Sequence, residues 1–206
     1  VTGFFYARLY NVIISNSIAS EQAMAFQAMN SIENLMDTAV HTTDTVNGTG
    51  LVRDLLNPAL EETLNDPMAY EKRFDRLYNL TSSLKDGNFI TDIRIYCDDQ
   101  LYSQLSSLNR ESRPLLIPLS LAGSWKDSLP ATREHMLFSD SLLSEAEREL
   151  GDLAVVNQIG SDETDTSSEA PKTSAFVAVY LSRELLEESL SGSLPIPEAI
   201  TYLVNE

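Results

Sequence analysis

The beginning of the chain restricts its fold more than any other feature, because residues 4–46 contain neither proline nor glycine. Apolar residues in this stretch keep to one face of a helix, at Ile18, Ala25, Met29, Ile32, Met36 and Ala39. A helix of about 40 residues would be about 60 Å long, which exceeds what a small domain needs. We therefore predict a helix that packs along a domain and continues as a stalk. A free coiled coil is the alternative, although the apolar stripe is not a strict heptad.

The charge of the chain argues against two classes of partner. Its 206 residues include 31 acidic and 14 basic ones, which gives a formal net charge of −17 at pH 7. Proteins bind DNA or RNA by placing Lys and Arg against the phosphates, and they need the same residues on an anionic membrane surface. We therefore expect neither nucleic acid nor a lipid surface as a partner. Hydrophobic residues make up 43% of the sequence, which is enough for a core.

The sequence also bears on the compartment and on the completeness of the chain. Cys97 is the only cysteine, so an intrachain disulfide cannot form. No run of about 18 apolar residues is present, so we expect no segment of this chain to span a bilayer. The apolar start, residues 1–14, lacks the basic flank and the cleavage site of a signal peptide, and it has no initiator Met. We interpret the chain as a fragment of a longer protein.

Further helices are predicted after the long one. Gly48 and Gly50 end the long helix, and residues 51–56 predict a short helix that Pro58 stops. Helical spacing resumes from Pro58 and continues to about Leu84, and residues 85–88 read as a turn. The short run at residues 142–150 also has helical character, as does the run at residues 183–190.

Three runs of β-type residues predict a sheet, at residues 90–97, 152–160 and 174–182. The last two flank a polar, acidic segment at residues 161–173, which we interpret as a surface loop. They are therefore expected to form a hairpin with the strand 90–97 beside it. Helices followed by an antiparallel sheet, with helices on one face, predict an α+β fold.

Two adjacent aspartates, Asp98 and Asp99, follow the first of these strands. We interpret them as a turn into a second, shorter strand, because Asp side chains bond to nearby backbone amides. A metal site is the alternative, but the pair lacks the alternating oxygen ligands and the glycine of a calcium loop. We therefore predict no metal here.

The residues that enzymes use are sparse. The sequence has no P-loop, nucleophile elbow, His-Glu-x-x-His motif or glycine-rich dinucleotide turn. Cys97 is expected to be a buried, inert thiol. His41 is interpreted as a polar position near a helix end, and His135 as a surface residue, with a ligand contact as its alternative. We expect a fragment that is not an enzyme and has no cofactor; a hydrolase that uses paired carboxylates remains an alternative.

A binding surface on the sheet is then the main candidate for function. In the strand 90–97, Ile93, Ile95 and Cys97 point to one side, and Asp92, Arg94 and Tyr96 to the other. Aromatic rings with a few hydrogen-bonding groups on a concave sheet suit a small polar ligand. Ordinary packing at the edge of the core is the alternative for the tryptophan and the tyrosines. The candidate ligand-binding residues are Arg94, Tyr96, Trp125, Arg133, Asn157 and Tyr180.

The order of these features resembles a known family. A long helix ending in "SIENLMDTAVHTTDTV" is followed by "LVRDLLNP", by "FITDIRIYCDDQLYS", by a lone tryptophan in "GSWKD", and by "AFVAVYLSRELLEESL" before "ITYLVNE". This order resembles the extracellular sensor region of bacterial membrane histidine kinases of the YesM-like type. Each motif is a spacing pattern rather than an invariant residue, so the specificity lies in their order, which covers nearly the whole chain.

The resemblance implies a fold and a role. It implies a PAS-like Cache domain with an antiparallel sheet, on the extracellular side of the cell membrane, in a two-component signalling protein. The expected parts are a stalk helix at residues 1–50, a membrane-distal sensor module at 51–190, and a linker with the first strand of a severed second module at 191–206. Membrane contact would occur only through flanking segments, and a second copy bound through the long helix is a candidate partner. Sensor regions of membrane-bound AraC-like regulators have the same architecture and are the alternative.

One departure concerns the ligand. Family members that bind amino acids carry an Arg-x-Trp-Tyr pattern, but here the region reads "LAGSWKDS". Gly123 stands in place of the arginine and Lys126 in place of the tyrosine. We therefore expect another small polar molecule of unknown identity, with carbohydrates among the candidates, or an interaction module without a small ligand.

Overall fold

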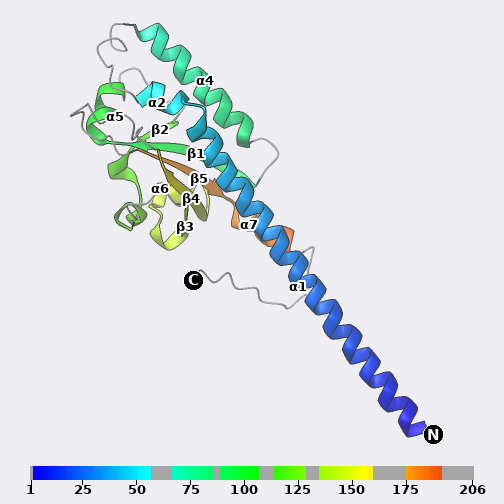
Figure 1. Cartoon of the computed structure of the whole chain (residues 1–206). Helices are drawn as coiled ribbons and strands as arrows, with labels where there is room; N and C mark the ends of the chain where they lie inside the picture. The colour runs from blue at the N-terminus through cyan, green and yellow to red at the C-terminus, as the bar shows by residue number, and fades with distance from the viewer. Residues whose placement is uncertain are drawn as a thin grey trace, which may run out of the picture. The chain divides into compact units, whose positions relative to one another are not determined.

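The computed structural model describes residues 2–56, 66–85, 89–106, 114–128, 135–159 and 175–191 (Figure 1). The side chains of residues 2–17 and part of the last helix lie outside this description. The chain divides into two compact units, one of residues 37–183 and the other of residues 1–36 together with 184–206. The boundaries predicted at residues 50 and 190, between the stalk helix, the sensor module and a second module, stay predictions.

The long N-terminal helix is confirmed as α1, Thr2–Gly48. It ends where predicted, because Gly50 adopts a φ of 70°, a left-handed conformation that glycine enters without steric cost. The last turns of α1 belong to the unit of residues 37–183, where Ala39, Thr43 and Val46 are fully buried. Among the described residues, no helix combines the length and the apolar character that crossing a membrane requires.

The sheet confirms the predicted α+β class. Its five strands lie in the order β2-β1-β5-β4-β3. The predicted hairpin is the antiparallel pair β4–β5, and β1 pairs antiparallel with β5 on its other side. β3 pairs antiparallel with β4, whereas β2 runs parallel to β1. The strands are β1 Ile90–Cys97, β2 Leu116–Pro118, β3 Met136–Ser139, β4 Leu153–Gln158 and β5 Phe176–Leu181.

Helices α2, Leu51–Leu56, and α4, Pro67–Lys85, pack against each other, and α4 also contacts β1 (Figure 1). The apolar stripe predicted for α4 is buried at Tyr70, Phe74 and Leu77. Part of the predicted helix, residues 58–65, lies outside the described residues, as do the turn at 86–88, the acidic loop at 161–173 and the strand at 200–206.

An apolar cluster joins the sheet to the segments between β2 and β4. It contains Tyr96 of β1, Phe138 of β3, Ala154 and Val156 of β4, and Phe176, Ala178 and Tyr180 of β5, with Ala122, Trp125 and Leu143 from the connecting segments. Where the structure describes them, those segments form the short 3-10 turns η1 Leu119–Leu121, η2 Ser124–Asp127 and η3 Asp140–Leu142, and the short helix α6, Glu145–Arg148. The aromatic face of the sheet is therefore filled by the chain itself.

The interpretation of Asp98 and Asp99 as a turn into a strand is wrong. The chain forms helix α5, Asp99–Ser106, instead of a second short strand. Asp98 caps this helix, since its Oδ1 accepts hydrogen bonds from the backbone N–H of Gln100 at 2.9 Å and of Leu101 at 3.4 Å. Leu101 and Leu105, one helical turn apart, are both buried. The tendency of Asp side chains to bond nearby backbone N–H groups, which suggested a turn, here caps the N-terminus of a helix. Helix α5 lies in the crossover connection between the parallel strands β1 and β2.

Candidate functional site

Three of the six predicted ligand-binding residues come together in the structure. Tyr96, Trp125 and Tyr180 share the apolar cluster on one face of the sheet. Trp125 has no exposed surface, and its ring lies edge-on to Tyr96 at a centroid distance of 5.4 Å and to Phe176 at 6.0 Å. It also stacks on Phe138 at 5.9 Å. Such ring pairs stabilise a core beyond the area that they bury.

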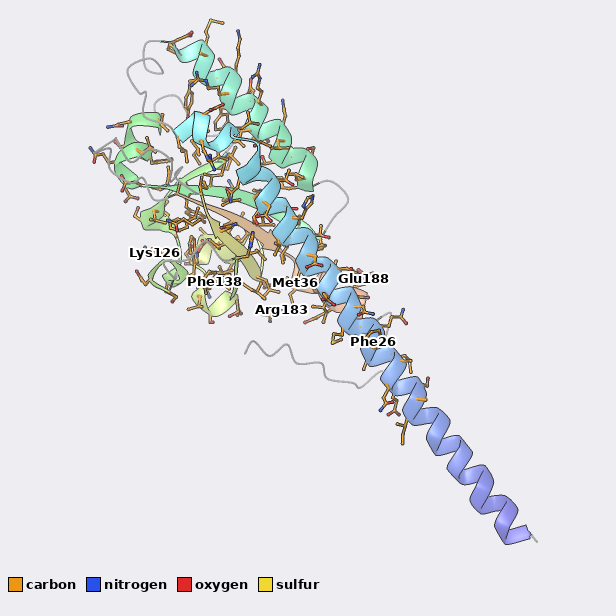
Figure 2. All side chains as sticks on the ribbon, in the orientation of Figure 1. Phe26, Met36, Lys126, Phe138, Arg183 and Glu188 are labelled. Atoms are coloured by element: carbon orange, nitrogen blue, oxygen red, sulfur yellow. The ribbon has the colours of Figure 1, made fainter. Side chains whose placement is uncertain are left out.

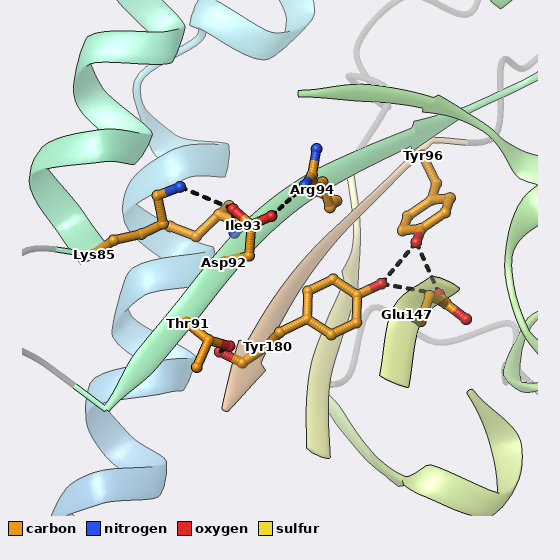
Figure 3. A network of polar contacts seen from close by, with 8 residues as sticks. All are labelled: Lys85, Thr91, Asp92, Ile93, Arg94, Tyr96, Glu147 and Tyr180. Carbon is orange, nitrogen blue, oxygen red and sulfur yellow. Dashed lines mark hydrogen bonds and ion pairs between the residues drawn. The ribbon is translucent and has the colours of Figure 1, made fainter. Parts of the chain in front are cut away.

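A buried carboxylate lies at the centre of these three residues. Glu147 of α6 is 2% exposed, and its Oε1 accepts three hydrogen bonds. Figure 3 shows the two from Tyr96 and Tyr180. The donors are the Tyr96 hydroxyl at 2.8 Å, the Trp125 indole Nε1–H at 2.8 Å and the Tyr180 hydroxyl at 2.9 Å. The polar ends of all three predicted residues are therefore occupied by one side chain of the same protein.

The second oxygen of Glu147 binds backbone groups. Oε2 accepts from the backbone N–H of Gly123 at 2.7 Å and from that of Ser144 at 2.7 Å. The bond to Ser144 is half of a capping box, because the Ser144 hydroxyl accepts in turn from the Glu147 N–H at the start of α6. We call Glu147 and its five donors, from Tyr96, Gly123, Trp125, Ser144 and Tyr180, the carboxylate cage.

The cage keeps Glu147 ionised without a basic partner among the described residues. Burial alone would raise the pKa of this carboxyl, but the hydrogen bonds from Ser144, Trp125, Tyr96 and Tyr180 together hold its pKa below the ordinary value of 4.5. Burial raises the pKa of both Tyr96 and Tyr180 far above the usual range of tyrosine. At neutral pH the two hydroxyls are therefore protonated donors and Glu147 is the acceptor.

Arg94 does not reach the cage. Its guanidinium pairs with Asp92 two residues earlier in β1, at 2.5 Å, and Asp92 also binds the Lys85 ammonium at 2.8 Å (Figure 3). Within the described part of the chain, the buried Nε of Arg94 has no hydrogen-bond partner. Arg94 therefore belongs to an ion-pair cluster where α4 meets the beginning of β1.

Asn157 lies on the opposite face of the sheet from the cage. Its neighbour Val156 belongs to the aromatic cluster, and successive strand residues point to opposite faces. The Asn157 amide nitrogen lies 2.8 Å from Nε2 of His135, and the same ring nitrogen lies 2.9 Å from Oδ1 of Asp44 in α1. These contacts connect the sheet to the last turns of the long helix. Arg133 lies outside the described residues.

Sequence reasoning missed the residue at the centre of the cage. Glu147 was one of many carboxylates in a segment expected only to be helical. A signal existed in the spacing of Ser144 and Glu147, which matches a capping box, although that motif does not by itself place the glutamate in a core. The backbone N–H of Gly123 has no sequence signal beyond the glycine itself.

The other candidate chemistries gain no support among the described residues. No group of three or more His, Cys, Asp and Glu side chains there is placed to hold a metal ion. Cys97 is buried, as predicted, and burial raises its pKa to about 12, so the thiolate is scarce at neutral pH. Comparisons of the chain with protein-family models, with curated proteins and with solved structures gave no match.

Proposed function

We propose that this chain is the extracytoplasmic sensor module of a two-component histidine kinase, which binds a small polar molecule and signals through α1. The α+β fold, with its antiparallel hairpin and long N-terminal helix, agrees with what the resemblance implies. The input module of a membrane-bound AraC-like regulator would have the same features. These features therefore support a sensing role and do not distinguish between a kinase and a DNA-binding output domain.

The observation that carries this proposal is the anchoring of α1. The helix is continuous from Thr2 to Gly48, and its last turns are buried in the unit that contains the sheet. The contacts from Asp44 through His135 to Asn157 tie those turns to β4. A change in the pose of the sheet would therefore move the helix, provided that the ligand binds one pose better than the other.

A ligand screen tests the sensor role. Melting temperatures of the wild-type chain are measured with sugars, oligosaccharides, amino acids and small carboxylates. A ligand at about a hundred times its Kd adds about 2.7 kcal/mol of stability, which raises the melting temperature by several degrees. Arg133→Ala is then expected to weaken binding of that ligand by at least about tenfold, as expected for a lost charge-assisted hydrogen bond. Arg148→Ala, at an exposed position of α6, is the matched control. A folded chain that responds to no class of compound contradicts the proposal.

A second candidate function, protein interaction without a small ligand, is favoured by two observations. The aromatic face of the sheet is filled by Trp125 and its neighbours. In addition, α1 exposes large apolar side chains at Ile18, Phe26 and Met29, which are 50%, 61% and 55% exposed. Figure 2 labels Phe26 among them. Exposed apolar groups at helical spacing are typical of a surface that another helix covers.

This candidate predicts self-association through α1. Sedimentation is expected to show a dimer of the wild-type chain, and Phe26→Glu is expected to raise its Kd at least about tenfold, because the variant places a charge in an apolar contact. Gln27→Glu adds the same charge at an adjacent exposed position of α1 and is expected to have a smaller effect. A chain that is monomeric at every concentration, or two variants with equal effects, would remove the support for this candidate.

A further inference from the structure

The carboxylate cage has the composition of an anion-binding site rather than of an ordinary core. Five neutral donors converge on one buried carboxylate, three on Oε1 and two on Oε2. We propose that these donors form a binding site for a carboxylate group, which the chain fills with its own Glu147. A free small monocarboxylate, such as formate or acetate, then occupies the site when the Glu147 side chain is absent.

Helix capping does not explain the cage. The capping box of α6 requires only the bond from the Ser144 N–H to Glu147. The other four donors come from elements far from α6 in the sequence: Tyr96 from β1, Tyr180 from β5, Trp125 from η2 and Gly123 from the position that caps η2. Helix capping does not need these four donors, so their convergence indicates a site that binds the carboxylate of Glu147.

The three side-chain donors are held in place independently of Glu147. Tyr96 and Tyr180 come from adjacent strands, β1 and β5, whose backbones pair residue by residue. Trp125 is fixed by its ring contacts with Tyr96, Phe138 and Phe176. A variant that lacks the glutamate therefore keeps these three donors close to their present positions, and it leaves them buried without the carboxylate acceptor, which is costly.

The chemistry of the cage selects a carboxylate over neutral groups. The N–H groups of Gly123, Trp125 and Ser144 can only donate, so the occupant must present an acceptor oxygen to each side of the cage, as a carboxylate does. A primary amide would turn its N–H₂ either toward the Trp125 indole or toward the Gly123 backbone N–H, donor against donor. The room left by truncation is no larger than the side chain that was removed, so formate and acetate fit and an aromatic acid does not.

In the wild-type chain, Glu147 excludes free acids because it is tethered. A side chain that is part of the same chain competes at an effective concentration that a free ligand in solution does not reach. The empty cage therefore exists only in variants or in states in which α6 moves away. The inference concerns the cage alone and does not depend on the proposed sensor role.

The test is chemical complementation of Glu147→Ala and Glu147→Gly. Melting temperatures of both variants and of the wild type are measured in sodium formate, sodium acetate and sodium benzoate at about 100 mM, with sodium chloride and acetamide as controls. Formate and acetate are expected to raise the melting temperature of each variant by about 3 °C or more over sodium chloride, as binding to the folded state requires. Benzoate and acetamide are expected to leave it unchanged, and the wild type is expected not to respond to any of them.

Three outcomes would overturn the inference. The first is an equal shift with chloride, which would indicate a general salt effect. The second is an equal response of the wild type, which would place the anion elsewhere. The third is that neither variant is stabilised by formate or acetate, including the case in which neither folds in their presence, because the donors would then depend on Glu147 for their positions. The ligand screen uses the wild-type chain, so the two proposals can fail independently.

Discussion

Replacing Gly123 with alanine is expected to destabilise the chain by about 3 kcal/mol or more, as overpacking against fixed atoms does. A Cβ at this position would lie 2.1 Å from the carbonyl oxygen of Leu142, 2.7 Å from the backbone nitrogen of Ser144 and 2.8 Å from Oε2 of Glu147. Two of these atoms are backbone, so they cannot rotate away. The methyl group would push the η2 segment off α6 and break the bond from the Gly123 N–H to Glu147.

Gly48→Ala is the matched control for this prediction. Gly48 ends α1, and a Cβ there would meet no atom within 4 Å. Alanine is compatible with a helical backbone and restricts the unfolded chain, so this variant is expected to be neutral or more stable by up to about 1 kcal/mol. Urea unfolding, followed by the fluorescence of the single tryptophan, Trp125, measures both variants. If Gly123→Ala unfolds at the same urea concentration as Gly48→Ala, the close packing at Gly123 is contradicted.

The fold was predictable where a local pattern determines it. The absence of proline and glycine from residues 4–46 predicts α1, and dense β-type residues predict β1, β4 and β5. The short strands β2 and β3 were not predicted, since their three and four residues are too few for an alternating pattern. An Asp at position 98 is compatible with a turn or with the N-cap of a helix. The helix α5 forms because it buries Leu101 and Leu105 together.

The candidate site was predictable only in part, because alternation assigns a face of the sheet without showing what covers it. It placed Tyr96 on the face opposite Ile95, and the structure brings Tyr180 of β5 to the same face beside Tyr96. Asn157 follows Val156 in β4 and therefore lies on the opposite face of the sheet. Its pairing with Val177 depends on how β4 and β5 register across a long connection, which no local pattern determines.

The centre of the cage is a contact between distant parts of the sequence. Glu147 is 51 residues from Tyr96 and 33 from Tyr180. A chain with 31 acidic residues does not mark which one is buried, because burial of a carboxylate depends on donors that only the folded chain assembles.

Replacing Glu147 with glutamine is expected to cost about 2–4 kcal/mol of stability at neutral pH, because it leaves buried donors facing a donor. Glutamine has nearly the same shape, so the aromatic packing around Trp125 is kept. Its amide N–H₂ must face either the side-chain donors on Oε1 or the backbone N–H groups of Gly123 and Ser144 on Oε2. Urea unfolding measures this loss, and Glu149→Gln, at an exposed position just after α6, is expected to stay within about 0.5 kcal/mol of the wild type.

The pH dependence of this stability loss shows whether Glu147→Gln acts by removing the negative charge or by disturbing the packing. The pKa of Glu147 is lowered in the folded chain, so its contribution to stability is present above the pKa of the unfolded chain, near 4.5, and is lost as the pH falls through the folded value. The difference in unfolding free energy between the wild type and Glu147→Gln is therefore expected to be constant from neutral pH down to about pH 5 and to shrink at lower pH. A difference that stays the same in acid would mean that the variant fails through packing, and that the ionised carboxylate is not what the five donors stabilise.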